Sequence, residues 1–107
     1  MLEGVLYQVV TKEAQSAEVR LLPESPIYAA HFPGYPITPG VTLVQMALEL
    51  MGAHLSGAKD IKFIQPVIPS AQGTLLRFEW SLREGSLADV NLFLPDGSLC
   101  AKMTLAL

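Results

Sequence analysis

The stretch that decides the fold is PGVTLVQMALELMGAHL, residues 39–55, which holds the only helix-length apolar pattern in the chain. Apolar side chains cover most of the circumference of the expected helix. Its polar residues Thr42, Gln45 and Glu49 recur at spacings of three and four, so they form one narrow stripe. A helix that is apolar nearly all round is typical of a buried helix, and we expect the rest of the chain to enclose it.

The ends of this helix carry their own signals. Thr38 is suited to cap the first turn, and Pro39 fits the first helical position, where its missing N–H costs nothing. At the other end His54 falls in the expected last turn, and Gly57 lies just beyond it. The sequence therefore predicts a helix from Pro39 to about Leu55.

Strand patterns lie on both sides of the helix. Downstream, apolar and polar residues alternate with a period of two, which predicts three antiparallel strands joined by short turns. Trp80 falls in the apolar phase of its strand, whereas Cys100 falls in the polar phase. The expected strands are residues 5–11, 17–22, 59–65, 74–83, 88–94 and 99–107. One buried helix with these strands predicts an α+β fold, in which a curved antiparallel sheet wraps around the helix.

Length and composition set the number of domains and exclude disorder. At 107 residues the chain is expected to form one domain, residues 1–107. Half of the residues are hydrophobic and 16% are charged, which excludes an intrinsically disordered protein. Because so short a chain keeps much of its surface exposed, this apolar content predicts an oligomer interface in addition to a core.

The charge pattern limits the partners and the location of the protein. The formal net charge is −3 and no basic run occurs, so we expect no binding to nucleic acid. Neither a signal-peptide pattern nor an apolar stretch of membrane-spanning length is found, so we expect no membrane association. A single cysteine, Cys100, fits a reducing compartment, and we expect a cytoplasmic protein.

The segment before the helix is the one suited to chemistry. Residues 31–40 read HFPGYPITPG, with three prolines and two glycines that restrict the backbone path. The segment has His31 at one end and a helix N-terminus at the other. An imidazole exchanges protons near neutral pH, and the first N–H groups of a helix are free donors. Together these groups are suited to take a proton from carbon and to stabilise the enolate oxygen that develops.

The string His31-Phe32-Pro33-Gly34-x-Pro36-x-x-Pro39-Gly40-Val41 resembles the signature of the hot-dog-fold 3-hydroxyacyl-[acyl-carrier-protein] dehydratases. Residues 62–69, KFIQPVIP, are similar to the strand and proline turn that follow the helix in that family. The order of the expected elements also matches, so the resemblance covers most of the chain. It implies a hot-dog fold, a curved antiparallel sheet wrapped around one long central helix.

For function, the resemblance implies dehydration of 3-hydroxyacyl thioesters, linked to acyl carrier protein or coenzyme A, to 2-enoyl thioesters. No metal or cofactor takes part in that family. The histidine at the position of His31 is the base on the α-carbon, and backbone N–H groups at Gly40 or Val41 hold the thioester carbonyl. The further substrate-binding positions that the resemblance implies are Phe32, Gly34 and Pro39. The family forms dimers with an acyl tunnel at each side of the interface, so we expect a homodimer or a higher homo-oligomer.

One position departs from the family pattern. In the family, an acidic residue on the central helix of the other subunit protonates the leaving hydroxyl. Its position falls at Gln45, and an amide is not a general acid at ordinary pH. Glu49 lies one turn further on, about 6 Å along the helix axis. We therefore expect Glu49 to supply the proton through a water, with Gln45 orienting that water or the substrate hydroxyl. An ionised glutamate that faces a tunnel also requires a hydrogen-bonding partner nearby.

Three functions follow from the sequence. The first is a dehydratase that acts on 3-hydroxyacyl thioesters with a modified acid. The second is a catalytically incomplete subunit that forms a heterodimer with a related, acid-bearing hot-dog chain. The third is an acyl-thioester binding protein or a thioesterase on the same fold, against which the retained His-Phe-Pro-Gly string argues.

Overall fold

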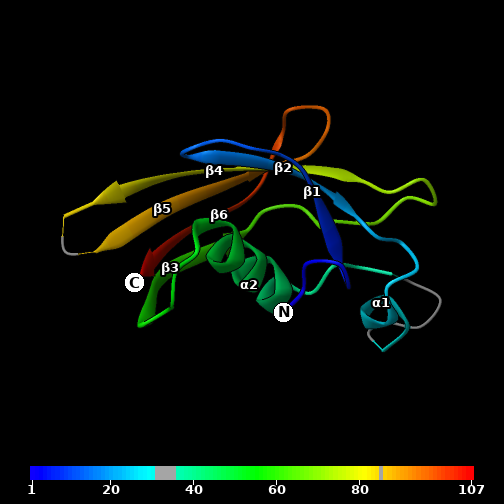
Figure 1. The fold of residues 1–107 in the computed structure, drawn as a ribbon, viewed down its shortest axis with the longest axis horizontal. Coiled ribbons are helices and arrows are strands. Elements are labelled where there is room, and N and C mark those ends of the chain that lie inside the picture. The colour runs from blue at the N-terminus through cyan, green and yellow to red at the C-terminus, as the bar shows by residue number, and fades with distance from the viewer. Residues whose placement is uncertain (31–35, 85) are drawn as a thin grey trace.

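Six antiparallel strands form one curved sheet around helix α2 in the computed structural model, which describes residues 1–30, 36–84 and 86–107 (Figure 1). The strands are β1 (Tyr7–Lys12), β2 (Ser16–Leu21), β3 (Gly57–Phe63), β4 (Leu75–Arg83), β5 (Leu87–Phe93) and β6 (Leu99–Ala106). Their order across the sheet is β1-β2-β4-β5-β6-β3, so β1 and β3 are its edges. The two helices are α1 (Pro26–Ala30) and α2 (Gly40–Met51). The predicted α+β arrangement of a curved sheet around a helix is confirmed.

The core lies between the concave face of the sheet and α2, as the alternation of the strands predicts. Five side chains of α2 belong to the same buried cluster as the inward-facing strand residues, namely Leu43, Met46, Ala47, Leu48 and Leu50. The strand residues of this cluster include Val19, Leu21, Leu76, Phe78, Trp80, Val90, Leu92, Met103 and Leu105. Leu82 continues the apolar phase of β4 but is 65% exposed, because the β4–β5 hairpin extends past α2 (Figure 1).

Helix α2 is shorter than predicted because Gly52 ends it. Gly52 adopts a left-handed conformation with φ of 65°, and its N–H and that of Ala53 bond back to carbonyl oxygens of the last turn. The prediction that the helix reaches Leu55, with His54 in its last turn, was therefore wrong. Neither helix in the described part of the chain is long and apolar enough to cross a membrane.

The start of α2 also differs from the prediction. Pro39 occupies the cap position, and the Thr42 hydroxyl donates to its carbonyl oxygen at 2.6 Å. The prediction of Thr38 as the cap was wrong, because its hydroxyl is paired with that of Tyr28 instead. Val41 is 75% exposed whereas Leu43 is buried, so one side of the first turn of α2 is uncovered.

Two local features differ from the sequence pattern for separate reasons. The pairing of β5 with β6 shifts register between Leu92 and Phe93, and Cys100 and Ala101 are consequently both buried. The assignment of Cys100 to a polar phase was therefore wrong. The short helix α1 was not predicted, although Ser25 followed by proline is a recognised helix-start signal.

Candidate active site

The start of α2 presents two backbone donors. The N–H groups of Thr42 and Leu43 both bond to the carbonyl oxygen of Pro39, at 3.0 and 3.3 Å. Among the described residues, no acceptor pairs with the N–H groups of Gly40 and Val41, the two positions predicted to hold the thioester carbonyl. These groups lie at the positive end of the helix dipole, so they can stabilise negative charge that develops on an oxygen.

Gly40 has a second role, which depends on its lack of a side chain. A Cβ atom on Gly40 would lie 2.5 Å from the ring of Phe63, at the end of β3. Glycine therefore allows the aromatic ring to lie against the first turn of α2. The ring borders a notch of about 270 Å³, whose lining also includes Ile37, Leu43 and Val67.

Two buried residues with paired hydroxyl groups come from the two sides of the proline-rich segment in the sequence. Tyr28 in α1 and Thr38 just before α2 are both buried, and their side-chain oxygens are 2.9 Å apart. The N–H of Thr38 also donates to the carbonyl of Val67 at 2.8 Å, which joins this point to the proline turn after β3. Three predicted site residues between these anchors lie outside the described residues, so their roles stay predictions: His31, Phe32 and Gly34.

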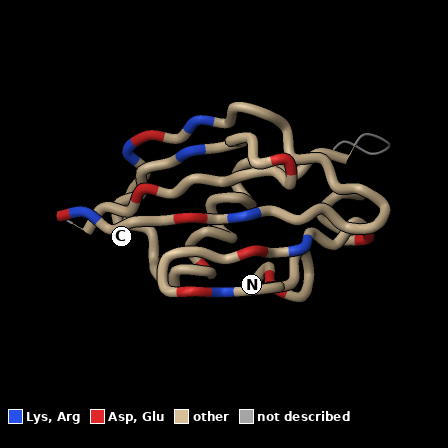
Figure 2. The backbone as a smooth tube through the Cα atoms, turned by 90° about the horizontal axis from the view of Figure 1, so that it is seen from above, with Lys and Arg blue, Asp and Glu red and all other residues tan. Residues whose placement is uncertain are grey.

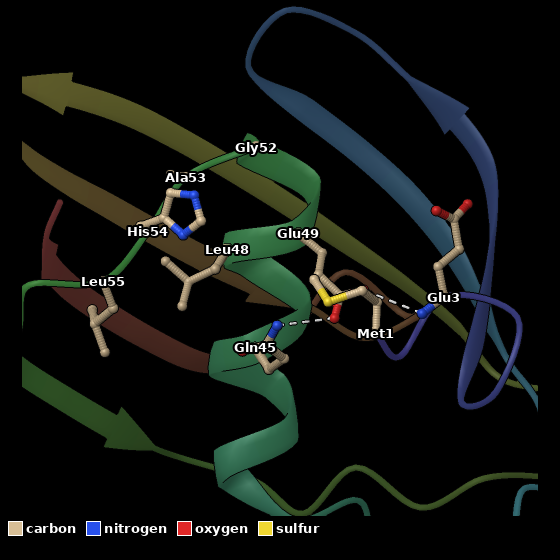
Figure 3. A pocket seen from close by; sticks show the side chains of 9 residues that line it. All are labelled: Met1, Glu3, Gln45, Leu48, Glu49, Gly52, Ala53, His54 and Leu55. Carbon is tan, nitrogen blue, oxygen red and sulfur yellow. Dashed lines mark hydrogen bonds between the residues drawn. The ribbon is translucent and has the colours of Figure 1, made fainter.

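The other end of α2 carries a carboxylate with four hydrogen-bond donors. Glu49 Oε1 accepts from the N–H of Glu3 at 3.1 Å and from the hydroxyl of Tyr7 at 2.8 Å. Its Oε2 accepts from the N–H of Leu2 at 2.9 Å. The same oxygen accepts from the side-chain amide of Gln45 at 3.0 Å, a bond that Figure 3 shows. We call Leu2, Glu3, Tyr7 and Glu49 the carboxylate clasp. Glu49 thus has the partners that its position requires, and three of the four belong to the start of the chain.

A tight turn brings these N-terminal donors to α2. Gly4 adopts a φ of 83°, and its N–H bonds to the carbonyl of Tyr7 at 2.7 Å. The N–H of Leu6 bonds to the carbonyl of Leu2 at 2.7 Å, which closes the turn. The two remaining N–H groups, of Leu2 and Glu3, are consequently directed to the carboxylate of Glu49.

These contacts determine the charge state of the clasp. Burial alone would raise the pKa of Glu49, but the bonds from Leu2, Gln45, Tyr7 and Glu3 outweigh it and hold that pKa below its ordinary value. Burial and the bond to Glu49 raise the pKa of Tyr7 well above its ordinary value. At neutral pH Glu49 is therefore an anion whose lone pairs are occupied by four donors. This geometry gives no support to the predicted role of Glu49 as an acid acting through a water.

Gln45 and Glu49 border an open cavity of about 560 Å³, which lies between α2, the segment that follows it and the first residues of the chain (Figure 3). Its lining consists of Met1, Glu3, Gln45, Leu48, Glu49, Gly52, Ala53, His54 and Leu55. Sequence reasoning missed the contribution of the N-terminal residues and of His54. The signal that could have pointed to His54 is Gly52. Because the helix ends at this glycine, His54 lies in the segment that lines the cavity together with Gln45 and Glu49.

Charges of both signs are interspersed over the surface. In Figure 2, Lys and Arg lie among Asp and Glu along the strands and do not separate into regions of one sign. Two exposed ion pairs, Arg77–Glu79 and Arg83–Asp89, join opposite charges. No group of three or more potential metal ligands gathers within the ranges 1–30, 36–84 and 86–107. Within these ranges, the backbone donors of Gly40 and Val41 and the carboxylate of Glu49 lie towards opposite ends of α2.

One family model matches most of the chain. It is that of the ApeI-like family, described as ApeI dehydratase, and it matches residues 8–99. No curated protein matches the sequence.

Solved structures share the fold at low sequence identity. The dehydratase domain from the CurK module of the curacin polyketide synthase has a TM-score of 0.62 and 14% identity, over 94% of this chain and 42% of that chain. A hypothetical thioesterase with coenzyme A from Streptococcus pneumoniae TIGR4 has a TM-score of 0.58 and 14% identity, over 92% and 81%. The PaaI protein of E. coli also has a TM-score of 0.58 and 14% identity, over 92% and 79%. The predicted hot-dog fold is thereby confirmed, and the chain spans less than half of the polyketide synthase domain.

Proposed function

The chain belongs to the ApeI-like dehydratase family, and from this premise we propose that it dehydrates 3-hydroxyacyl thioesters to 2-enoyl thioesters. The carrier of the acyl group is acyl carrier protein or coenzyme A. The observation that carries the proposal is the start of α2, where the N–H groups of Gly40 and Val41 meet no acceptor among the described residues. These two donors suit the thioester oxygen of the substrate. The family resemblance implies that the 3-hydroxyl is held by the residue at position 45 on the central helix of the other subunit, which is Gln45 in this chain.

In the proposed reaction, each group of the site has one task. The imidazole of His31 takes the proton from the α-carbon, while the N–H groups of Gly40 and Val41 stabilise the enolate oxygen. Re-formation of the thioester carbonyl makes the C2–C3 double bond and breaks the C3–O bond. Gln45 binds the departing hydroxyl.

The proton balance closes without a carboxylic acid. The imidazolium on His31 holds the proton that left the α-carbon, and the hydroxyl accepts this same proton as it leaves, which gives water. His31 is thereby returned to its neutral form. This scheme accounts for an amide at position 45, because the hydroxyl needs to be oriented there and not protonated.

We further propose that the protein acts as a homodimer. A second copy would cover the apolar side chains near the start of α2 and the end of β3, where Val41, Phe63, Ile64 and Ile68 are all at least half exposed. Edge strand β3 also has unpaired backbone groups along one side. A heterodimer with a related hot-dog chain is the alternative assembly, and sedimentation of the purified chain at micromolar concentration distinguishes the two. A folded monomer at that concentration would contradict the homodimer.

Mass spectrometry of purified protein incubated with 3-hydroxyacyl and 2-enoyl thioesters tests the reaction. Dehydration gives a product lighter by one water, and hydration of the enoyl thioester gives the reverse. Release of free acid and thiol would instead identify a thioesterase, the function for which one similar solved structure, a hypothetical thioesterase, is named. The saturated Glu49 argues against that function, because it has no lone pair left to activate a water. Turnover only after addition of a second hot-dog chain would support the incomplete subunit.

A further inference from the structure

The carboxylate of Glu49 determines the direction of the Gln45 amide. An ionised carboxylate only accepts hydrogen bonds, so the Gln45 atom 3.0 Å from Glu49 Oε2 is the amide nitrogen. The carbonyl oxygen of the same amide therefore points away from Glu49. Both side chains lie beside the cavity on one side of α2 (Figure 3). The oxygen, together with the second N–H, is left for the molecule that occupies the cavity.

Glu49 is itself held from outside α2. The N–H groups of Leu2 and Glu3 and the hydroxyl of Tyr7 approach its two oxygens from the N-terminal turn and β1. A carboxylate that accepts two bonds on each oxygen has little rotational freedom left. The Gln45 amide bonded to it is therefore restricted to one orientation before substrate arrives.

We propose that Glu49 is a positioning residue, which presents the carbonyl oxygen of Gln45 to the 3-hydroxyl of the substrate; this inference rests on the proposed function. The hydroxyl hydrogen is donated to the Gln45 oxygen, so a lone pair of the hydroxyl oxygen is free to receive the proton from His31. Glu49 neither gives nor takes a proton. Its contribution is the pre-set geometry of the amide.

The first test requires no turnover. In NMR spectra of ¹⁵N-labelled protein, the side-chain NH₂ signal of Gln45 is expected to titrate with Glu49, at a midpoint below the ordinary glutamate value of 4.5. Glu49→Gln should abolish this titration. Glu84→Gln changes an exposed carboxylate next to the β4–β5 turn and should leave it intact. If the Gln45 signal titrates in the same way in Glu49→Gln as in the parent chain, the inference is overturned, even when the parent chain is an active dehydratase.

The same spectra distinguish the effect of Glu49 on the Gln45 signal from the effects of the other titratable groups at the clasp and the cavity. Those groups are Glu3, Tyr7, His54 and the amino group of Met1. Glu3→Gln keeps the backbone N–H that bonds to Glu49, so the acidic titration of Gln45 should persist. His54→Gln should leave the acidic midpoint in place as well. Loss of the titration in either variant, with Glu49 unchanged, would also overturn the inference.

The second test separates positioning from proton transfer. Glu49→Gln is expected to lower kcat by roughly 10- to 100-fold, while the pH profile of kcat keeps the acidic limb that protonation of His31 produces, because no reacting group is removed. Tyr7→Phe keeps the ring, deletes one donor and should lower kcat by roughly 2- to 10-fold. An alkaline limb in the parent profile that disappears in Glu49→Gln would show that Glu49 is a proton donor and would overturn the proposal. Unchanged kcat in Tyr7→Phe would overturn it as well, should Glu49→Gln not fold.

Discussion

The two ends of α2 differ in how completely their polar groups are paired. At the C-terminal end, Glu49 accepts four hydrogen bonds, and the left-handed Gly52 returns its N–H to the last turn. At the N-terminal end, the N–H groups of Gly40 and Val41 meet no acceptor within the described residues, and the Val41 side chain is largely exposed. We call the C-terminal end of α2, where the polar groups are paired, the finished end. We call the N-terminal end, where the N–H groups of Gly40 and Val41 meet no acceptor, the open end.

This difference predicts that the C-terminal end contributes to stability, in addition to its proposed role in orienting Gln45, whereas the N-terminal end serves binding. Paired groups at the finished end contribute to the folded state itself, because removal of the acceptor leaves several donors without a partner. Free donors beside exposed apolar side chains contribute little until another molecule covers them. The contrast can be tested by changing each end and measuring stability and turnover separately.

The largest effect is expected from the segment that leads into the open end. His31→Ala should lower the dehydration rate by roughly 10²–10⁴-fold, because the general base is lost. The thermal midpoint should change little. Steady-state rates and thermal melts on the same samples check this. An unchanged rate in a folded variant would remove His31 from the reaction.

At the finished end, Glu49→Ala should act on stability. The variant removes the acceptor from two backbone N–H groups, the hydroxyl of Tyr7 and the amide of Gln45. Because these donors are only partly buried and water can replace some bonds, we expect a loss of about 1–3 kcal/mol in the free energy of unfolding. Urea titration measures it. A loss below about 0.5 kcal/mol, the range of an ordinary surface change, would contradict the clasp as a stabilising feature.

The hydroxyl pair beside the open end should give a smaller effect. Tyr28→Phe and Thr38→Val each leave one buried hydroxyl without its partner, at an expected cost of about 1 kcal/mol. The double variant should cost less than the sum of the two, because the second change removes the orphaned group. Thr11→Val on the exposed face of β1 is the matched control. Strict additivity would indicate that the two hydroxyls do not share a bond.

The clasp should also give stability an acid dependence. The pKa of Glu49 in the folded protein lies below its ordinary value of 4.5, so its contribution is present above that pH. It is lost as the pH falls through the folded-state pKa. Asp89 and Asp96 also have lowered pKa values, so the parent and Glu49→Gln should be compared directly. The difference between their free energies of unfolding should shrink as the pH falls. A difference that stays constant with pH would contradict a stabilising role of the ionised Glu49 carboxylate.

The smallest effect on stability is expected at Gly40. An added Cβ would displace the ring of Phe63, which is 53% exposed and therefore free to move outward. Gly40→Ala should change the free energy of unfolding by less than about 1 kcal/mol and should alter KM for the thioester. Gly57→Ala, whose Cβ would meet nothing within 4 Å, is the control. A KM equal to that of Gly57→Ala would show that the position of the Phe63 ring does not affect substrate binding.

The strands and the buried helix could be predicted because both depend on local patterns. Burial of Leu76, Phe78 and Trp80 follows from the alternation of β4 alone. The helix end was misjudged because Ala53 and Leu55 continue the apolar character past Gly52, although the glycine is a stop signal. Cys100 was misjudged because a single register shift exchanges the faces of a strand, and no residue type marks that shift.

Only the part of the candidate site that comes from a single segment, the start of α2, could be predicted from the sequence. The donors of Gly40 and Val41 follow from the Pro-Gly pair at a helix start. The partners of Glu49 could not be predicted, because Leu2 and Glu3 bond through their backbone N–H groups, which every residue except proline has. The stripe of Gln45 and Glu49 was visible, but the direction of the amide depends on those distant donors.

The carboxylate clasp also bears on the kinetics of folding. It joins residues that are 46 and 47 positions apart in the chain, so it closes only after β1 and α2 have docked on the same sheet. Contacts that form after the transition state leave the folding rate nearly unchanged and slow the unfolding rate. We therefore expect the contacts between the N-terminal turn and Glu49 to slow unfolding and to leave the folding rate nearly unchanged.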